Sequence, residues 1–159
     1  MAETGVHLTF CNWMRQDATT KRICRMVSVV NSTVSMKSKE IAQRAFGFSC
    51  KIVKLHERLE SRGGAARRLA GQVLNSGTSI GANLEEATAG QTKPDFIAKV
   101  SVARKEARET VYWLRLLVAT ELVRRGEVAW ELNEAEQFVA ILGSIVFNAR
   151  SSPYRGRLR

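Results

Sequence analysis

The sequence predicts an all-α protein that folds as an antiparallel, up-down-up-down four-helix bundle. Apolar residues recur in steps of four and three along four long segments, which places them on one face of each predicted helix. The 159 residues include only two prolines, so long helices can form without interruption. Short connections separate the segments and favour antiparallel neighbours. We therefore expect a single helical domain around one core.

The first predicted helix runs from about Ser38 to Ser61. Its apolar residues form an unbroken stripe: Ile41, Ala45, Phe48, Ile52, Leu55 and Leu59. Ser38 is a suitable cap because a serine hydroxyl can accept a hydrogen bond from a backbone N–H of the first turn. The pair Gly63-Gly64 is expected to end the helix.

The segment before this helix, residues 1–35, shows no sustained helical period, so we expect an irregular extension. Met36 stands directly before the bundle, as it would if translation began there instead of at Met1. The predicted division of the chain is an extension over residues 1–35, a bundle over 36–150 and a basic tail over 151–159.

The second predicted helix runs from about Ala65 to Ala89. Small and polar residues occur in its stripe, which consists of Leu69, Val73, Ser76, Ile80, Asn83 and Ala87. It also contains Gly71, Gly77 and Gly81. Each internal glycine costs about 1 kcal/mol against alanine, which is tolerable where the glycine lets a neighbouring helix approach closely.

The third predicted helix runs from Pro94 to about Val123, with Thr92 as its cap and Asp95 near its positive end. Its stripe consists of Phe96, Val100, Ala103, Ala107, Val111, Leu114 and Val118. The fourth is expected to begin between Glu127 and Asn133 and to end near Arg150. Its stripe consists of Leu132, Ala135, Phe138, Leu142 and Ile145.

The chain is basic, with 25 lysines and arginines against 15 acidic residues and a formal net charge of +10. Such an excess favours polyanions in general, without choosing between RNA, DNA and anionic lipid, and a well-solvated surface is the alternative interpretation. The three cysteines are an odd number without C-x-x-C spacing, which favours a reducing cytoplasm over a disulfide framework. No apolar run approaches the roughly 20 residues of a membrane helix.

The sequence offers no pattern for catalysis. Cys50 and His56 are six residues apart, or about 600° around a helix, so they lie on different faces and cannot form a nucleophile–base pair. His56 also lacks the Glu-x-x-His pattern of di-iron bundles. We expect no enzymatic activity, no cofactor and no metal.

Four stretches resemble a known family: Ser76–Ala87 (SGTSIGANLEEA), Asp95–Ile97, Lys105–Thr110 and Tyr112–Leu117. They are similar to the four-helix-bundle proteins encoded in intervening sequences of 23S ribosomal RNA genes, and the similarity extends from Lys37 to Arg150. That family also resembles the accessory variability protein of diversity-generating retroelements, a basic ring-forming bundle that works with nucleic acid and a reverse transcriptase. The resemblance implies a small antiparallel bundle, often pentameric, with no enzymatic activity attached to it.

Two polar residues stand out in the second helix, Asn83 on the apolar stripe and Glu86 one turn further on. Both match an Asn-x-x-Glu pattern of the family. We expect a structural role, in which Asn83 hydrogen-bonds across the bundle and Glu86 pairs with Arg104. A pocket for a ligand or partner is the alternative.

Trp113 and Leu116 lie outside the stripe of the third helix, in a segment that is apolar nearly all round. An exposed apolar surface of this kind typically marks an interface. We interpret the two residues as a subunit contact of a homo-oligomer, with a pentamer favoured by the resemblance. The alternative is an oversized core that the fourth helix covers.

These observations favour a non-enzymatic, oligomeric binding module for RNA or other nucleic acid. The alternative is a structural or adaptor protein for another protein, such as a reverse transcriptase. The residues expected to contact nucleic acid are arginines near helix ends and in the tail: Arg67, Arg68, Arg124, Arg125, Arg150, Arg155, Arg157 and Arg159.

Overall fold

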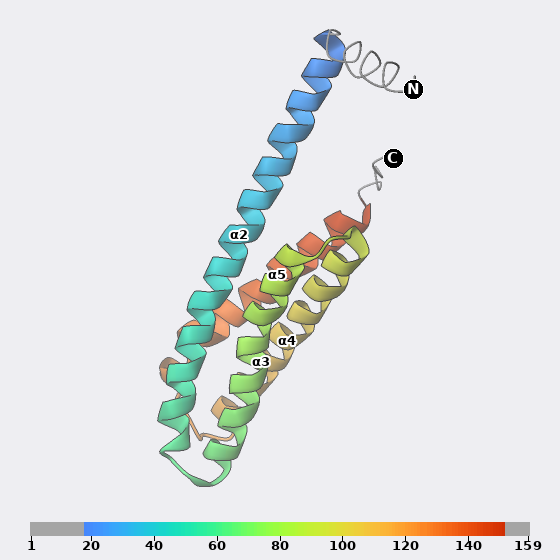
Figure 1. Ribbon diagram of the computed structural model, residues 1–159. Coiled ribbons are helices and arrows are strands. Elements are labelled where there is room, and N and C mark those ends of the chain that lie inside the picture. The colour runs from blue at the N-terminus through green and yellow to red at the C-terminus, as the bar shows by residue number, and fades with distance from the viewer. Residues whose placement is uncertain (1–17, 152–159) are drawn as a thin grey trace, which may run out of the picture. The chain divides into compact units, whose positions relative to one another are not determined.

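A computed structural model describes residues 18–151, with side chains described from residue 39 onward. The chain divides into two units, residues 1–39 and 40–159. The helices are α2 (Ala18–Glu60), α3 (Gly64–Ala89), α4 (Lys93–Ala119), the short 3-10 helix η1 (Arg125–Glu127) and α5 (Ala129–Ser151) (Figure 1). The described part contains no strand, so the predicted all-α class is confirmed.

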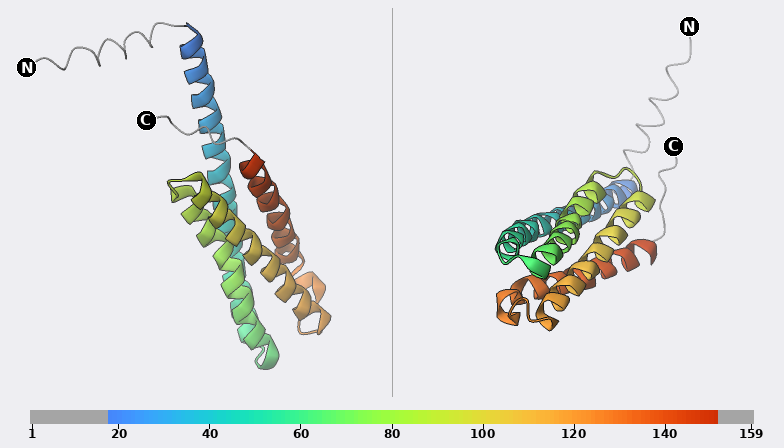
Figure 2. Two further views of the ribbon diagram at one scale, coloured as in Figure 1. Left: turned by 90° about the vertical axis from the view of Figure 1, so that its right-hand side faces the viewer. Right: turned by 90° about the horizontal axis from the view of Figure 1, so that it is seen from below.

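In the second unit, residues 40–60 of α2 form an antiparallel four-helix bundle with α3, α4 and α5 (Figures 1 and 2). Each helix packs against the next, and α5 packs back on α2. One close approach represents each neighbouring pair: Ile52 against Gly77, Ser76 against Thr110, Arg104 against Gly143, and Phe48 against Phe138. The helices therefore enclose one shared core.

The core follows the predicted stripes closely. In α2, five of the six stripe residues are buried and Ile41 is half-buried. Phe48 meets Phe138 edge-on at the centre, with ring centroids 5.4 Å apart. In α4 the stripe shifts slightly, because Leu117 is fully buried whereas Val111 and Val118 are only half-buried.

The start of α2 corrects two sequence expectations. The helix begins at Ala18, so the predicted start at Ser38 is wrong, and residues 18–35 are helical instead of irregular. Neither glycine nor proline occurs between Ala18 and Phe46, and extending an existing helix is far easier than nucleating one. Residues 1–17 of the predicted extension lie outside the described residues, as do residues 152–159 of the predicted tail.

The helix ends show why the connections are short. Gly63 and Gly64 both have positive φ, 71° and 56°, which glycine adopts without strain. The α2 helix ends just before this pair, as predicted, and Gly64 is the first residue of α3. Thr92 caps α4 as predicted, because its Oγ1 accepts a hydrogen bond from the Asp95 N–H at 3.3 Å.

No helix in the described part has an apolar stretch long enough to cross a membrane.

The end of α4 comes at Ala119, four residues before the predicted Val123. Glu121 turns into the left-handed region with φ of 56°, and the Val123 N–H then donates to the Leu117 carbonyl at 3.3 Å. The Glu121 N–H donates to the Val118 carbonyl at 3.1 Å, which is one of the two bonds of the motif that commonly closes helices with a residue of positive φ. The chain is thereby turned toward η1 and α5.

Candidate nucleic-acid interface

Arginines from two connections meet at one end of the bundle. Because the helices are antiparallel, the α2–α3 connection and the η1 connection lie at the same end (Figure 1). Arg67 and Arg68 lie in the first two turns of α3, and Arg124 and Arg125 lie at η1. The structure thus brings these four predicted residues to one end of the fold.

Arg62 joins the two connections and was missed by sequence reasoning. Its guanidinium donates to the Leu122 carbonyl at 2.8 Å and forms an ion pair with Glu127. We refer to Arg62, Arg67, Arg68, Arg124 and Arg125 as the arginine end. Nothing in the local sequence distinguishes Arg62 from its neighbours, because its role depends on the far connection.

Acidic groups neutralise only part of the arginine end. The Glu127 carboxylate accepts a hydrogen bond from the Arg124 N–H at 2.8 Å, and this bond, followed by the one from Arg62, lowers the pKa of Glu127. Arg67 lies 3.7 Å from Glu60. Arg68 and Arg125 have no acidic partner among the described residues, and both are exposed. Their guanidinium groups are free to bind anions.

The remaining predicted arginines do not join this end. Arg150 lies in the last turn of α5, at the opposite end of the helix from η1. Arg155, Arg157 and Arg159 lie outside the described residues. The predicted set is therefore divided between two places in the fold.

The predicted polar cluster around Asn83 does not form. Asn83 is half-buried, and its amide donates to the Ser79 carbonyl of its own helix at 2.8 Å, so the predicted bond across the bundle is wrong. Glu86 pairs with Lys99 and not with Arg104. Glu86 lies near the end of α3, opposite the first turns of the antiparallel α4. Arg104 lies five residues beyond Lys99, about 7.5 Å further along α4.

The buried polar contact between α3 and α4 involves different residues. Thr110 Oγ1 donates to Ser76 Oγ at 3.0 Å, and the Ser76 hydroxyl donates to the Gln72 carbonyl at 2.9 Å. Both side chains are buried. Ser76 lies on the predicted stripe of the second helix. Thr110 lies on the same face of the third helix as Ala107 and Leu114, at spacings of three and four, and this spacing could have identified it as the partner of Ser76. This pair holds α3 and α4 in register.

The apolar residues at the end of α4 remain partly accessible. Trp113 is half-buried against the core, and its Nε1 donates to Glu109 Oε1 at 3.0 Å. Tyr112 is exposed and meets the Trp113 ring edge-on, with centroids 4.8 Å apart. Leu116 is half-buried. Tyr112, Trp113 and Leu116 form what we call the α4 aromatic surface, and its use as a subunit contact stays a prediction.

Glu106 on α4 is a half-buried carboxylate whose pKa is raised, first by burial and then by the charge of Glu109. A raised pKa means that the ionised form opposes folding at neutral pH. We expect Glu106→Gln to increase the free energy of unfolding at pH 7 by about 0.2–0.5 kcal/mol. The gain should disappear below about pH 4, where the carboxyl is protonated in both states.

Urea denaturation at pH 7 and pH 3.5 checks this expectation, with Glu85→Gln on the exposed face of α3 as the control. A loss of stability in Glu106→Gln at pH 7 would show that the carboxylate is stabilising, contrary to the account.

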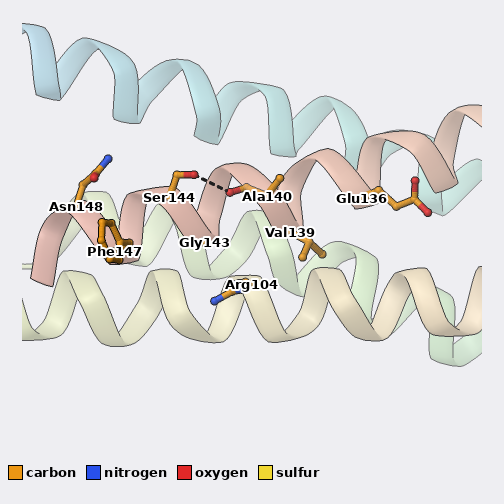
Figure 3. A pocket seen from close by; sticks show the side chains of 8 residues that line it. All are labelled: Arg104, Glu136, Val139, Ala140, Gly143, Ser144, Phe147 and Asn148. Carbon is orange, nitrogen blue, oxygen red and sulfur yellow. Dashed lines mark hydrogen bonds between the residues drawn. The ribbon is translucent and has the colours of Figure 1, made fainter.

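A groove lies between α4 and α5. On α5 its wall is a stripe in steps of four, three and four: Glu136, Ala140, Gly143 and Phe147. Figure 3 shows Phe147 at one end of the stripe, Glu136 at the other, and Arg104 reaching from α4 toward Gly143. Val139, Ser144 and Asn148 complete this groove, which is largely open to solvent and has a volume of about 610 Å³. The small residues at its centre create the hollow.

The two residues considered for catalysis lie on α2. Cys50 is exposed, whereas His56 is half-buried and 3.7 Å from Glu60. Among the residues that the structure describes, no group of three or more histidine, cysteine, aspartate or glutamate side chains is placed to hold a metal ion. Within the described residues, the arginine end and the α4–α5 groove each carry at least one arginine without an acidic partner.

Comparisons with known proteins agree with this fold. Residues 37–144 match the family described as 23S rRNA-intervening sequence protein. A solved protein from the S23 ribosomal protein family of Bacteroides thetaiotaomicron VPI-5482, described as having unknown function, is 37% identical. The match covers 70% of this chain and 98% of that chain, with a TM-score of 0.64. No curated protein sequence matches significantly. The bundle, its helix order and the matched residues show that the chain belongs to the 23S rRNA-intervening sequence protein family.

Proposed function

We propose that this protein is a non-enzymatic, homo-oligomeric RNA-binding module of the cytoplasm. The observation that carries the proposal is the arginine end, where arginines near two connections lie at the same end of the bundle and two of them lack acidic partners among the described residues. Arginine is well suited to phosphate because its planar guanidinium can donate two parallel hydrogen bonds. The net charge of +10 supports the same partner.

The family relationship supports RNA as the polyanion. The matched family is named for an intervening sequence of 23S rRNA, and the solved relative is assigned to a ribosomal protein family. Neither name describes a contact, so the proposal for this chain rests on its own arginines. The bond from Arg62 to the Leu122 carbonyl fixes the two connections together, which reduces the conformational entropy lost on binding.

Oligomerisation would strengthen each weak contact. The α4 aromatic surface offers an apolar contact area to another copy of the chain, and we propose a pentameric ring on this basis and on the family resemblance. A ring would present several arginine ends to one RNA. Binding through several linked sites increases overall affinity without any new contact within a subunit.

The test replaces three arginines of the arginine end with glutamine, in the variant Arg68→Gln/Arg124→Gln/Arg125→Gln. Each phosphate contact on single-stranded RNA contributes about 0.7 to the slope of log affinity against log salt. We expect the slope to fall by about 2 for each arginine end engaged, with similar weakening for unrelated sequences. Fluorescence anisotropy with labelled RNA measures both quantities.

A matched control removes the same charge elsewhere, in the variant Lys39→Gln/Lys51→Gln/Lys105→Gln, whose lysines are exposed and lie outside the arginine end. This control should change the slope of log affinity against log salt less than the arginine triple variant does. Equal effects of the two triple variants would show that only total charge matters. Absence of RNA binding by the wild type at low salt would favour the alternative, an adaptor for another protein such as a reverse transcriptase.

A further inference from the structure

The α4–α5 groove brings together an exposed aromatic ring and a guanidinium that has no ion-pair partner among the described residues. Phe147 is 70% exposed, the largest exposure among the large hydrophobic residues described. Arg104 is exposed and forms no ion pair with any described residue. We propose that this groove is a subsite for one nucleotide of single-stranded RNA. The base would stack on Phe147, and the phosphate would bind Arg104.

This proposal rests on the RNA-binding function proposed above and adds a mode of recognition to it. Aromatic side chains beside cationic groups are the usual means by which proteins hold single-stranded nucleic acid, because every base offers a face for stacking. A volume of about 610 Å³ is within the range of small-molecule sites. The groove is therefore large enough for a nucleotide.

Gly143 is the residue that makes the groove possible. A Cβ atom at this position would lie 3.2 Å from the Cζ atom of Arg104. Even a methyl group here would crowd the guanidinium, which would have to shift by a few tenths of an ångström. Together with Ala140, one turn earlier, Gly143 leaves room for the Arg104 guanidinium at the centre of the groove, and Phe147 lies at one end.

The polar groups of the groove set a direction for the RNA. Glu136 at the far end repels phosphate, whereas Arg150 lies one turn beyond Phe147 and is exposed. The phosphates would therefore run from Arg104 toward Arg150, away from Glu136. Asn148 offers an amide donor and acceptor beside the ring. The Ser144 hydroxyl donates to the Ala140 carbonyl at 3.1 Å, which leaves its oxygen as an acceptor.

The first experiment compares the full chain's affinity for an eight-nucleotide oligouridine with that for an abasic RNA of equal length and charge. Stacking predicts that the oligouridine binds at least about fivefold more tightly at the same salt concentration. Phe147→Ala should remove this difference and leave the affinity for abasic RNA unchanged. Phe46→Ala, which removes another exposed phenylalanine, on α2, is the control and should preserve the difference.

A second variant blocks the groove without changing its charge or its aromatic ring. Ala140→Leu places a larger side chain at an exposed position of α5, and leucine is a good helix former, so the fold should be kept. It should weaken oligouridine binding at least about fivefold, to the abasic level. Ala98→Leu, at an exposed position of α4, is the control and should not weaken oligouridine binding. Thermal melting and light scattering confirm that each variant keeps its fold and oligomeric state.

The possible outcomes separate this proposal from the function on which it rests. Equal binding of oligouridine and abasic RNA by the wild type would overturn the subsite and leave the arginine end intact. Binding of neither RNA would overturn both proposals. Specific binding of a glutamate-rich peptide that Ala140→Leu abolishes would overturn the nucleotide proposal and assign the groove to an acidic protein segment. Ultraviolet crosslinking of oligouridine to the tryptic peptide over residues 126–150 would support the subsite.

Discussion

Replacing Gly77 with leucine is expected to destabilise the bundle by about 3 kcal/mol, although leucine is the better helix former. A Cβ atom at this position would lie 2.9 Å from both Cγ atoms of Ile52, which is fully buried on α2. Neither helix can yield without disturbing the core, because protein interiors are close-packed. Urea denaturation followed by circular dichroism measures the change.

Gly71→Leu is the matched control on the same helix, since a Cβ atom there would have no neighbour within 4 Å. It should increase stability by up to about 1 kcal/mol. In an Ile52→Ala background the penalty of Gly77→Leu should shrink, because the opposing Cγ atoms are gone. Additive effects of the two substitutions would contradict close packing at this point.

Removing the guanidinium of Arg44 is expected to be the second large perturbation. Arg44 donates to both carboxylate oxygens of Glu134, at 2.5 and 2.9 Å, and to Gln137 at 2.6 Å. The Glu134 side chain is only 10% exposed. Arg44→Ala would leave this carboxylate unpaired, so we expect a loss of about 2–3 kcal/mol, below the full cost of a buried pair because solvent reaches Arg44.

A double substitution distinguishes the pair's net contribution from the penalty of breaking it. Arg44→Met/Glu134→Met removes both charges and should be close to the wild type in stability. Lys99→Ala, which breaks the exposed pair with Glu86, should change stability little. Urea denaturation measures all three variants. A small loss in Arg44→Ala would mean that Glu134 is adequately solvated without its partner.

The fold could be predicted because the apolar residues that recur every three or four positions in the sequence are the residues that pack in the core. Phe48, Ile52 and Leu55 are buried where the stripe of α2 placed them. The start of α2 could not be predicted in this way. Residues from Ala18 onward continue the helix without supplying a periodic stripe, and only the absence of glycine and proline indicated that a helix was permitted.

The candidate sites were predictable only where topology alone decides position. Antiparallel helices bring Arg67 and Arg125 to one end, and this follows from the order of the helices. The partner of Glu86 depends instead on the register of α3 against α4, which helix periodicity leaves open. The lining of the α4–α5 groove depends on how α4 and α5 are rotated about their axes, because this rotation places Arg104 opposite Gly143. Helix periodicity does not fix this rotation.

The salt dependence of RNA binding by the full chain tests the central claim most directly. Affinity for an unstructured RNA is measured between 50 and 200 mM salt, about the range over which phosphate contacts weaken markedly. At least three contacts at the arginine end predict a linear fall of log affinity with log salt, with a slope of about −2 or steeper. Absence of binding at 50 mM salt, or affinity independent of salt over about this range, would contradict the account.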